Sequence, residues 1–252
     1  MKDAHCRGLI HKQVLRFRKG TWESIEDVVS DEQSLTIVWQ DTLTGDHGQA
    51  ALWSWPHDLA PLALGHVLLD IRFQGCILAR QCAVAKNSES EYAVTLGAPR
   101  EKQISQPPQR ISGSALFRAM HAFIKSEGQW DGTGCFHRAG CFDPVSGQFL
   151  FKAEDIGRHN CLDRLAGWSA MNAIPLAQTI LFTSARITAS LCAKALRAGF
   201  QVLVSRSAVT TSSIALAEEH KVTLVGFART DEERLTLFAD PQGRISIDNH
   251  CE

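Results

Sequence analysis

The sequence lacks the features that mark a membrane protein or a general nucleic-acid binder. No apolar run approaches the ~20 residues that a membrane-spanning helix needs, and the segment from Met1 to Arg7 has no apolar core of a signal peptide. The net charge is only -1, so no overall field attracts nucleic acid or an anionic membrane. We therefore expect a cytoplasmic protein with neither of these as a partner, in which any phosphate recognition is local.

Paired cysteines are also lacking. The chain has 8 cysteines, and no two of them form a Cys-x-x-Cys motif; they stand at positions 6, 76, 82, 135, 141, 161, 192 and 251. Without a Pro-Cys-x-x-Cys pair, zinc-dependent deamination is excluded, and we expect neither zinc nor another metal site. In the cytoplasm single cysteines are expected to be reduced thiols, most of them buried as small apolar side chains.

The composition is that of a globular protein. With 252 residues, 44% of them hydrophobic, the chain can bury about 70 to 75% of its unfolded surface, enough for one large domain or two small ones. Residues 1 to 34 are mixed and polar, which favours an arm or an edge strand. The elements predicted after them are strands at 35–39 and 51–55 joined by a turn at 44–48, a helix at 56–69, and a strand pair at 76–84 and 92–96.

A boundary divides the chain into two predicted domains. Residues 97 to 113 are polar and hold three prolines, which is typical of a linker or mobile loop. We therefore predict a small α+β domain over residues 1–100, a loop over 101–113, and an α/β domain over 114–252. After a helix at 114–126, this second domain alternates strands at 135–142, 148–151, 178–183, 201–205 and 222–227 with helices at 158–172, 187–198 and 211–220, before two short strands at 235–238 and 244–247.

That alternation predicts a largely parallel sheet flanked by helices.

One segment of the second domain is unusual. Glu154 to Arg164 places acids, arginines, a histidine and a cysteine around Gly157, where a strand gives way to a helix. Gly157 can adopt a backbone angle forbidden to other residues, and the first helical turn then presents N–H groups that attract anions. Arg158 and His159 would lie beside those donors.

Two further interpretations concern the same segment. His159 and Asp163 are four residues apart, so on a helix they share a face and the carboxylate could orient the imidazole. The alternative is a helix start with a solvated polar face, because charge clusters are often only that. The residues alone leave both interpretations open.

Three loops that follow predicted strands carry similar chemistry. Each loop combines hydroxyl groups with an arginine, and the groups concerned are Ser184 and Arg186, Ser205, Arg206 and Ser207, and Arg229 and Thr230. In open α/β sheets ligands bind beyond the carboxyl ends of the strands, and a planar guanidinium suits bidentate phosphate recognition. The loops therefore predict a site for a polyanion. The alternative is that serine and threonine only cap the following helices.

From residue 132 onward the sequence closely resembles the FdhD/NarQ family of formate dehydrogenase accessory sulfurtransferases. The matches are Gly132-Thr133-Gly134 with His137, the segment 154–160 with Asp163, Ser184 with Arg186, Ala198-Gly199, residues 205–208 and residues 224–229. The N-terminal third is only loosely similar. The resemblance implies a three-layer α/β domain like that of cytidine deaminases, and a protein that transfers sulfur from a cysteine desulfurase to the molybdenum cofactor for formate dehydrogenase.

The resemblance also implies a ligand, the molybdopterin guanine dinucleotide, bound as the client. Its implied contacts are Phe227, Ala228, Arg229, Thr230, Asp231 and Glu232 with the guanine nucleotide portion, beside Arg158, His159, Ser184, Arg186, Ser205 and Ser207 from the other loops. The chain departs from the family at residues 231–233, which are three acids. A homodimer is a fair expectation for accessory proteins of this kind.

The larger departure concerns sulfur. The family carries a Cys-x-x-Cys pair in the loop before the helix at 114–126, whereas this chain has no cysteine between Cys82 and Cys135. Cys135 is the candidate surrogate for the persulfide, since a cationic His137 or Arg138 could lower the pKa of its thiol; a buried structural cysteine is the favoured alternative. Rival functions are a noncatalytic chaperone that binds the cofactor and an interaction module with a relic pocket.

Overall fold

The computed structural model describes residues 9–69, 80–99, 108, 110–129 and 133–247. The N-terminal unit is a four-stranded sheet in the order β4-β3-β6-β5, covered on one face by helix α1 (Leu59–Leu68). Its strands are β3 (Gln33–Asp41), β4 (His47–Ser54), β5 (Arg80–Ser88) and β6 (Glu91–Pro99). Alternate residues Leu35, Ile37 and Trp39 are buried, as the period of a half-covered strand requires, and the hairpin and the helix are confirmed.

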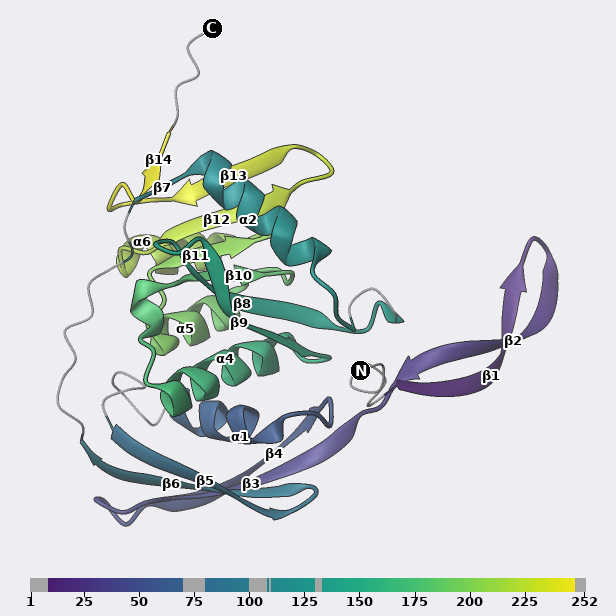
Figure 1. Cartoon of the computed structure of the whole chain (residues 1–252), viewed down its shortest axis with the longest axis horizontal. Helices are drawn as coiled ribbons and strands as arrows, with labels where there is room; N and C mark the ends of the chain where they lie inside the picture. The colour runs from purple at the N-terminus through teal and green to yellow at the C-terminus, as the bar shows by residue number, and fades with distance from the viewer. Residues whose placement is uncertain (1–8, 70–79, 100–107, 109, 130–132, 248–252) are drawn as a thin grey trace, which may run out of the picture.

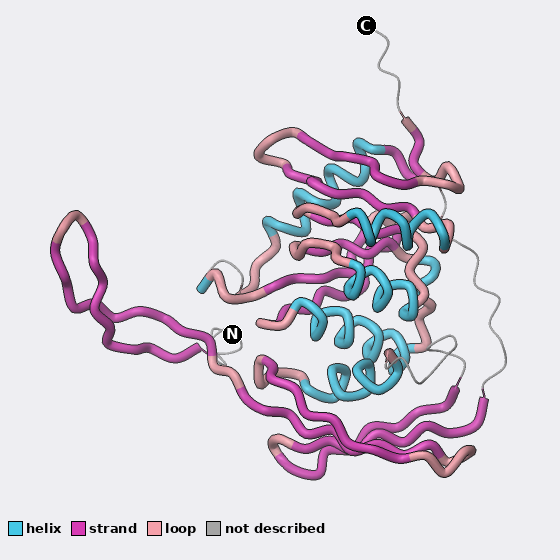
Figure 2. Tube along the Cα trace, turned by 180° about the vertical axis from the view of Figure 1, so that it is seen from behind, coloured by secondary structure: helices cyan, strands magenta, loops and turns pink. Residues whose placement is uncertain are grey.

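An arm precedes this sheet. Strands β1 (Leu9–Arg18) and β2 (Thr21–Ser30) pair antiparallel as a separate two-stranded ribbon. The ribbon projects far from the rest of the molecule (Figures 1 and 2). Of the two predicted possibilities for this part of the chain, an arm or an edge strand, the arm is confirmed.

The C-terminal unit contains a six-stranded sheet in the order β13-β12-β11-β10-β8-β9. Its strands are β8 (His137–Asp143), β9 (Gln148–Asp155), β10 (Ile180–Thr183), β11 (Val202–Ser205), β12 (Thr223–Arg229) and β13 (Arg234–Ala239). Only β10, β11 and β12 run parallel, so the prediction of a largely parallel sheet is wrong in part. The reason is loop length: turns of four residues join β8 to β9 and β12 to β13, and such short connections permit only antiparallel pairing.

Helices cover both faces of this sheet and make the predicted three layers. Helices α4 (Arg158–Asn172), α5 (Ala189–Ala198) and α6 (Thr211–Glu219) lie on one face, and α2 (Gly113–Lys125) lies on the other (Figure 1). Successive residues of a strand point to opposite faces of the sheet. Leu181 and Leu203 belong to the core beneath α4 to α6, whereas Phe182 and Val204 pack with α2. A short pair, β7 (Ile111–Ser112) with β14 (Ile245–Ser246), completes the described strands.

The two units join through α1 and α4. A Cβ added at Gly65 would lie 1.8 Å from the carbonyl oxygen of Asp163, and one at Gly167 would lie 1.9 Å from that of Pro61. The two helices therefore meet backbone against backbone, and one hydrophobic core runs from the N-terminal sheet into the C-terminal unit. Most of the predicted linker lies outside the described residues, and its end forms β7. Within the described parts of the chain, no helix has the length and apolarity to cross a bilayer.

Candidate functional site

The predicted site lies at the edge of the six-stranded sheet where β10, β11 and β12 end. Strand β8 runs opposite to β10, with Ala139 beside Thr183, so that His137 at the start of β8 reaches the same edge. Strand β9 ends there too, with Asp155 beside His137, and α4 begins directly afterwards. The segment 154–164 and the loop after β10 are thus brought together.

Asp155 and Arg164 form a buried ion pair beneath this edge. The Nε and Nη2 atoms of Arg164 lie 2.9 and 2.7 Å from Oδ2 of Asp155, and both side chains are at most 4% exposed. The same guanidinium donates to the backbone carbonyl groups of Trp55, His57 and Asp58. Arg164 therefore fastens the start of α1 to the C-terminal unit, which is a structural role.

Gly157 is required for space and not for an unusual backbone angle. Its φ is -93°, in the extended region, so the prediction of a special conformation is wrong. A Cβ at this position would lie 2.8 Å from Nδ2 of Asn160, and that Nδ2 donates to Oδ1 of Asp155 at 2.9 Å. The absence of a side chain at Gly157 lets Asn160 approach Asp155. Oδ1 of Asp155 also accepts a hydrogen bond from the Gly157 N–H.

Asp163 does not orient His159. Its Oδ2 accepts from Nζ of Lys194 at 2.6 Å and lies 3.3 Å from Nδ1 of His66, whereas Nε2 of His159 lies 3.3 Å from the hydroxyl of Ser190. The predicted pairing of His159 with Asp163 is therefore wrong, because Asp163 is buried against α1 and α5. Burial, followed by the positive charges of Lys194 and Arg158, lowers the pKa of His159.

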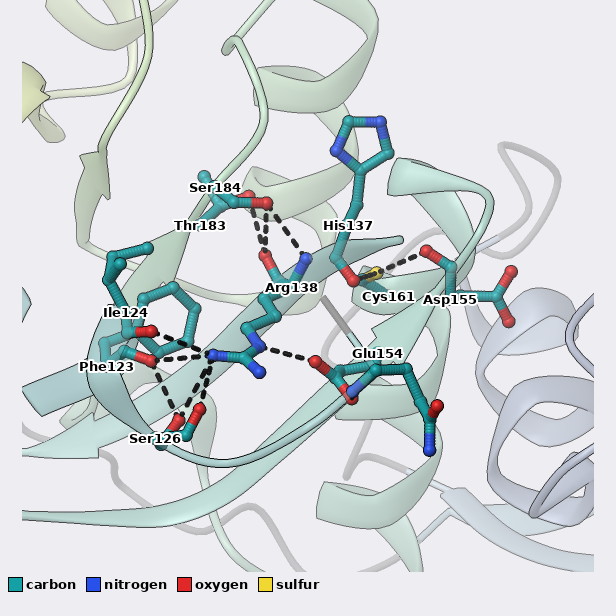
Figure 3. A network of polar contacts seen from close by, with 11 residues as sticks. Phe123, Ile124, Ser126, His137, Arg138, Glu154, Asp155, Cys161, Thr183 and Ser184 are labelled. Carbon is teal, nitrogen blue, oxygen red and sulfur yellow. Dashed lines mark hydrogen bonds and ion pairs between the residues drawn. The ribbon is translucent and has the colours of Figure 1, made fainter. Parts of the chain in front are cut away.

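Arg138 is buried within β8, with 2% of its side chain exposed. Its Nε lies 2.5 Å from Oε1 of Glu154, and Nη1 donates to the carbonyl groups of Phe123, Ile124 and Ser126 at the end of α2 (Figure 3). The guanidinium thus satisfies the carbonyls that a helix leaves open at its C-terminus. Because Arg138 holds these groups, the structure contradicts the idea that it activates Cys135.

Two of the four hydroxyl groups predicted to bind the ligand, those of Ser184 and Ser205, serve the backbone. Oγ of Ser184 accepts from the N–H of Arg138 at 2.9 Å. Oγ of Ser205 donates to the carbonyl of Ala185 at 2.7 Å and accepts from the N–H of Ser207 at 2.8 Å. These contacts favour a structural role over ligand binding for Ser184 and Ser205. Thr210 also has a structural role, since its side chain caps α6.

Positive charge at the edge lies on Arg158 and Arg186, beside the ring of His137. Burial lowers the pKa of His137, and the charges of Arg158 and Arg186 lower it further, so both guanidinium groups act on the same imidazole. Neither guanidinium has an ion-pair partner among the residues that the structure describes, and Nδ1 of His137 is buried there without a hydrogen-bond partner. The arrangement suits an anion, because unmatched cations and a buried nitrogen face the same edge.

The Phe227 loop, here residues 227–234 at the ends of β12 and β13 together with the turn between them, also carries arginines, but acids match them. The Phe227 backbone has a φ of 49°, and the guanidinium of Arg234 lies 4.1 Å from the centre of its ring. Arg229 and Arg234 both pair with Glu232. Much of the positive charge predicted for this loop is therefore neutralised within it.

The rest of the loop follows the same pattern. Asp231 lies 3.6 Å from Arg206, the arginine of the preceding loop, Ala228 is buried, and Thr230 is half-buried. The acids by which this chain departs from the family pattern thus hold arginines of its own. The contacts predicted for residues 227–232 with a nucleotide remain a prediction.

The described cysteines differ sharply in environment. Burial raises the pKa of the thiols of Cys141 to about 12 and of Cys192 to about 11, and it raises that of Cys161 as well. Cys135 is exposed, so the favoured alternative of a buried residue is wrong for it. Cys6, Cys76 and Cys251 lie outside the described residues, and among those described no three His, Cys, Asp or Glu side chains are grouped to hold a metal ion.

Sequence reasoning missed the partners of Asp163, namely His66 and Lys194. Lys194 is 9% exposed although it lies on a helix that also displays exposed residues. A lysine within the apolar face of an amphipathic helix was a usable signal, because a buried ammonium group needs an acid beside it. His66 had no comparable signal.

Comparisons with known proteins agree on one family. The sequence model described as the FdhD/NarQ family matches residues 71–245. "Protein FdhD" of Methanocaldococcus jannaschii is 41% identical over 100 residues, which cover 40% of this chain and 44% of that protein. "Sulfur carrier protein FdhD" of Mycolicibacterium paratuberculosis is 35% identical over 137 residues, covering 54% of this chain and 50% of that protein. The chain thus spans about half the length of these relatives.

Two longer matches extend the comparison. "Sulfur carrier protein FdhD" of Listeria monocytogenes is 25% identical and aligns with 91% of this chain and 96% of its own length. A crystal structure from Desulfotalea psychrophila, described as that of a candidate formate dehydrogenase accessory protein, superposes with a TM-score of 0.76 at 20% identity. It covers 94% of this chain and 99% of that one. At this identity the superposition establishes a shared fold.

Proposed function

Since the chain belongs to the FdhD/NarQ family, we propose that it is an accessory protein for formate dehydrogenase. In this proposal it binds the molybdopterin guanine dinucleotide at the edge formed by His137, Arg158 and Arg186. The homologues named sulfur carrier proteins support the accessory role. We also propose that the protein works as a homodimer.

The observation that carries the ligand proposal is the unmatched positive charge. Arg158 and Arg186 reach the edge from different elements, α4 and the loop after β10, and both act on His137. A pyrophosphate brings several negative oxygens to one place, and guanidinium groups bind such oxygens through charge-assisted hydrogen bonds. The cluster therefore fits the diphosphate of a dinucleotide, and in this proposal Phe227 contacts the nucleotide portion.

The test is calorimetry with GDP, the nucleotide part of the proposed ligand. We expect the wild-type protein to bind GDP, and Arg186→Ala or Arg158→Ala to weaken binding about tenfold, since a charged hydrogen bond contributes about 1.5 kcal/mol or more. Arg118→Ala is the matched control: Arg118 is exposed on α2, on the far face of the sheet. No measurable heat at millimolar GDP would contradict the proposal and favour the relic pocket.

For sulfur transfer we propose Cys135 as the acceptor of sulfur from a cysteine desulfurase. The Cys135 thiolate would attack the outer sulfur of the donor's persulfide, forming a new S–S bond while the donor's S–S bond breaks and its cysteine leaves as a thiolate. The exposure of Cys135 supports this, because the buried thiols of Cys141, Cys161 and Cys192 have raised pKa values and resist ionisation.

A noncatalytic chaperone that presents the cofactor is the second candidate function. It is favoured by one observation, the lack of a Cys-x-x-Cys pair anywhere in the chain. Loading with a desulfurase and radiolabelled cysteine separates the two functions. Loss of the label in Cys135→Ala, but not in the control Cys82→Ala, supports sulfur transfer through Cys135. A label that survives every single cysteine substitution overturns that role, and no label on the wild-type protein favours the chaperone.

A further inference from the structure

The tip of the β1–β2 arm exposes three large apolar side chains. Leu15, Phe17 and Trp22 are 69%, 58% and 68% exposed, respectively, and the rings of Phe17 and Trp22 lie 5.2 Å apart. In the register of the ribbon, Phe17 pairs with Trp22 and Leu15 with Ser24. These four residues therefore share one face, and that face carries no charge near the tip.

The other face of the same tip is charged. Arg16 pairs with Glu23 across the ribbon, and Nη2 of Arg16 lies 2.9 Å from Oδ2 of Asp27. A ribbon that is apolar on one face and charged on the other has the pattern of a strand pair whose apolar face packs against another protein surface. A two-stranded ribbon standing alone is also only marginally stable in water, so the arm's own contacts do not account for its length.

A second uncovered surface lies on the N-terminal sheet, on the face opposite to α1. The pairings of Val38 with Gln49 and Ala93, and of Gln40 with His47 and Thr95, place these six side chains on one face. They surround a hollow of about 610 Å³, whose remaining lining residues are Trp39, Gly48 and Val94. Since Trp39 and Val94 direct their side chains to the buried face, their backbone forms the floor of the hollow.

We propose that the apolar tip of the arm packs into this hollow on a second copy of the chain, so that two copies exchange arms. Three features match. The tip is convex and bulky where the sheet is hollowed, neither surface carries Asp, Glu, Lys or Arg at the contact, and each chain offers one of each surface. Copies of a hollow cannot fill one another, which disfavours direct packing of the two sheet faces.

The chain's own arm does not fill its own hollow. In both views the arm extends away from the molecule and the tip lies far from the four-stranded sheet (Figures 1 and 2). Reciprocal exchange of arms gives a dimer with twofold symmetry. Both arms and both hollows are then occupied, so no free surface remains to add further copies. Sheet packing on sheet through such side chains resembles the interior of a β-sandwich.

The experiment measures the mass of the full-length protein in solution by light scattering after gel filtration. We expect a dimer for the wild type, and half that mass for the arm variant Phe17→Glu/Trp22→Glu and for the hollow variant Ala93→Lys. The control is Val145→Glu, which alters an equally exposed apolar side chain in the β8–β9 turn and should leave the dimer intact. Circular dichroism shows whether each variant is folded.

Mixing the two monomeric variants gives the decisive result. An intact arm from the hollow variant can enter the intact hollow of the arm variant, so the mixture should regain a dimer that neither variant forms alone, with weaker affinity because one contact of two remains. A monomeric wild type, a dimeric arm variant, a dimeric hollow variant, or a mixture that stays monomeric would each overturn the proposal. The arm exchange rests on the proposed homodimer, so a monomeric wild type contradicts both, whereas a dimeric arm or hollow variant contradicts the exchange alone. GDP binding is measured separately and tests the ligand proposal independently.

Discussion

The charged residues beneath the sheet edge and those on it come from the same short segment, yet they do different work. Asp155, Asp163 and Arg164 point inward and are buried, where each has a partner of opposite charge. Arg158 points to the edge and has no ion-pair partner among the described residues. Charge in this segment therefore stabilises the fold where it is buried and matched, and is available to a ligand at Arg158, where it is half-buried and unmatched.

A second comparison lies along the edge itself. The arginines of the Phe227 loop are matched by Glu232 and Asp231, whereas Arg186 in the loop after β10 is not matched by any described residue. An anion that binds Arg186 therefore does not have to displace an acidic side chain of the described residues. Positive charge in the sequence is thus a poor measure of binding capacity until its acidic neighbours are known.

The largest effect should come from breaking the buried pair. Asp155→Asn leaves the guanidinium of Arg164 buried without a counter-charge, and we expect a loss of about 3 to 5 kcal/mol in the free energy of unfolding. Urea denaturation measures it. The control is Asp231→Asn, whose ion pair with Arg206 is exposed and contributes under about 1 kcal/mol. Equal losses in the two variants would contradict the division between buried and edge charges.

A smaller effect should follow from separating α1 and α4. In Gly167→Ala the new methyl group meets the backbone of Pro61, so the helices must move apart and the Arg164 contacts with the start of α1 lengthen. Overpacking of this kind costs about 1 to 3 kcal/mol, which thermal unfolding can detect. Gly113→Ala is the matched control, because nothing lies within 4 Å of a Cβ there; destabilisation of that variant instead would argue against close helix packing.

A still smaller effect is expected when the Phe227 loop loses its acid. Glu232→Gln releases Arg229 and Arg234. Because an exposed pair is worth about 0.2 to 1 kcal/mol, GDP should bind a few times more tightly, and the loss in the free energy of unfolding should be no larger than that. Calorimetry beside Glu219→Gln, an exposed acid at the end of α6, tests this. Unchanged or weaker GDP binding would show that Glu232 does not compete with the ligand.

The smallest effect concerns the pKa of His137. Arg186→Ala removes a like charge, so that pKa should rise towards its usual value while remaining lowered by burial. A bound polyanion acts in the same direction, so the affinity for GDP should increase as the pH falls below neutrality and the imidazole gains its proton. NMR titration of the histidine ring gives the pKa; a fall in Arg186→Ala would show that the two groups are not close neighbours.

Much of the local structure was predictable. The helix at 158–172 begins and ends as its pattern predicts, because an apolar repeat and a strand-to-helix switch are written in adjacent residues. The direction of β8, β9 and β13 was not, since strand patterns do not record orientation. Only the four-residue turns that join these strands to their neighbours indicate antiparallel pairing. The alternation of strands and helices, which favours a parallel sheet, dominated the prediction.

The site was less predictable than the fold. Arg158 and Arg186 both act on His137 at one edge, but Ser184 and Ser205 turn their hydroxyls to the backbone. Gly157 was singled out for the wrong reason, because the close approach of Asn160 depends on the hydrogen bond that Asp155 offers. Whether a polar atom faces a ligand or the fold depends on neighbours that are distant in sequence.

By itself the sequence determined the family, most of the secondary structure of the C-terminal unit, and the lack of a Cys-x-x-Cys pair. The tertiary structure alone decided which charges are matched. The partners of Asp163 lie 97 and 31 residues away, and Arg164 reaches carbonyl groups more than 100 residues earlier. Hydrogen bonds and ion pairs act over a few ångströms of space, so the roles of the charges in one segment follow from folding and not from the order of the residues.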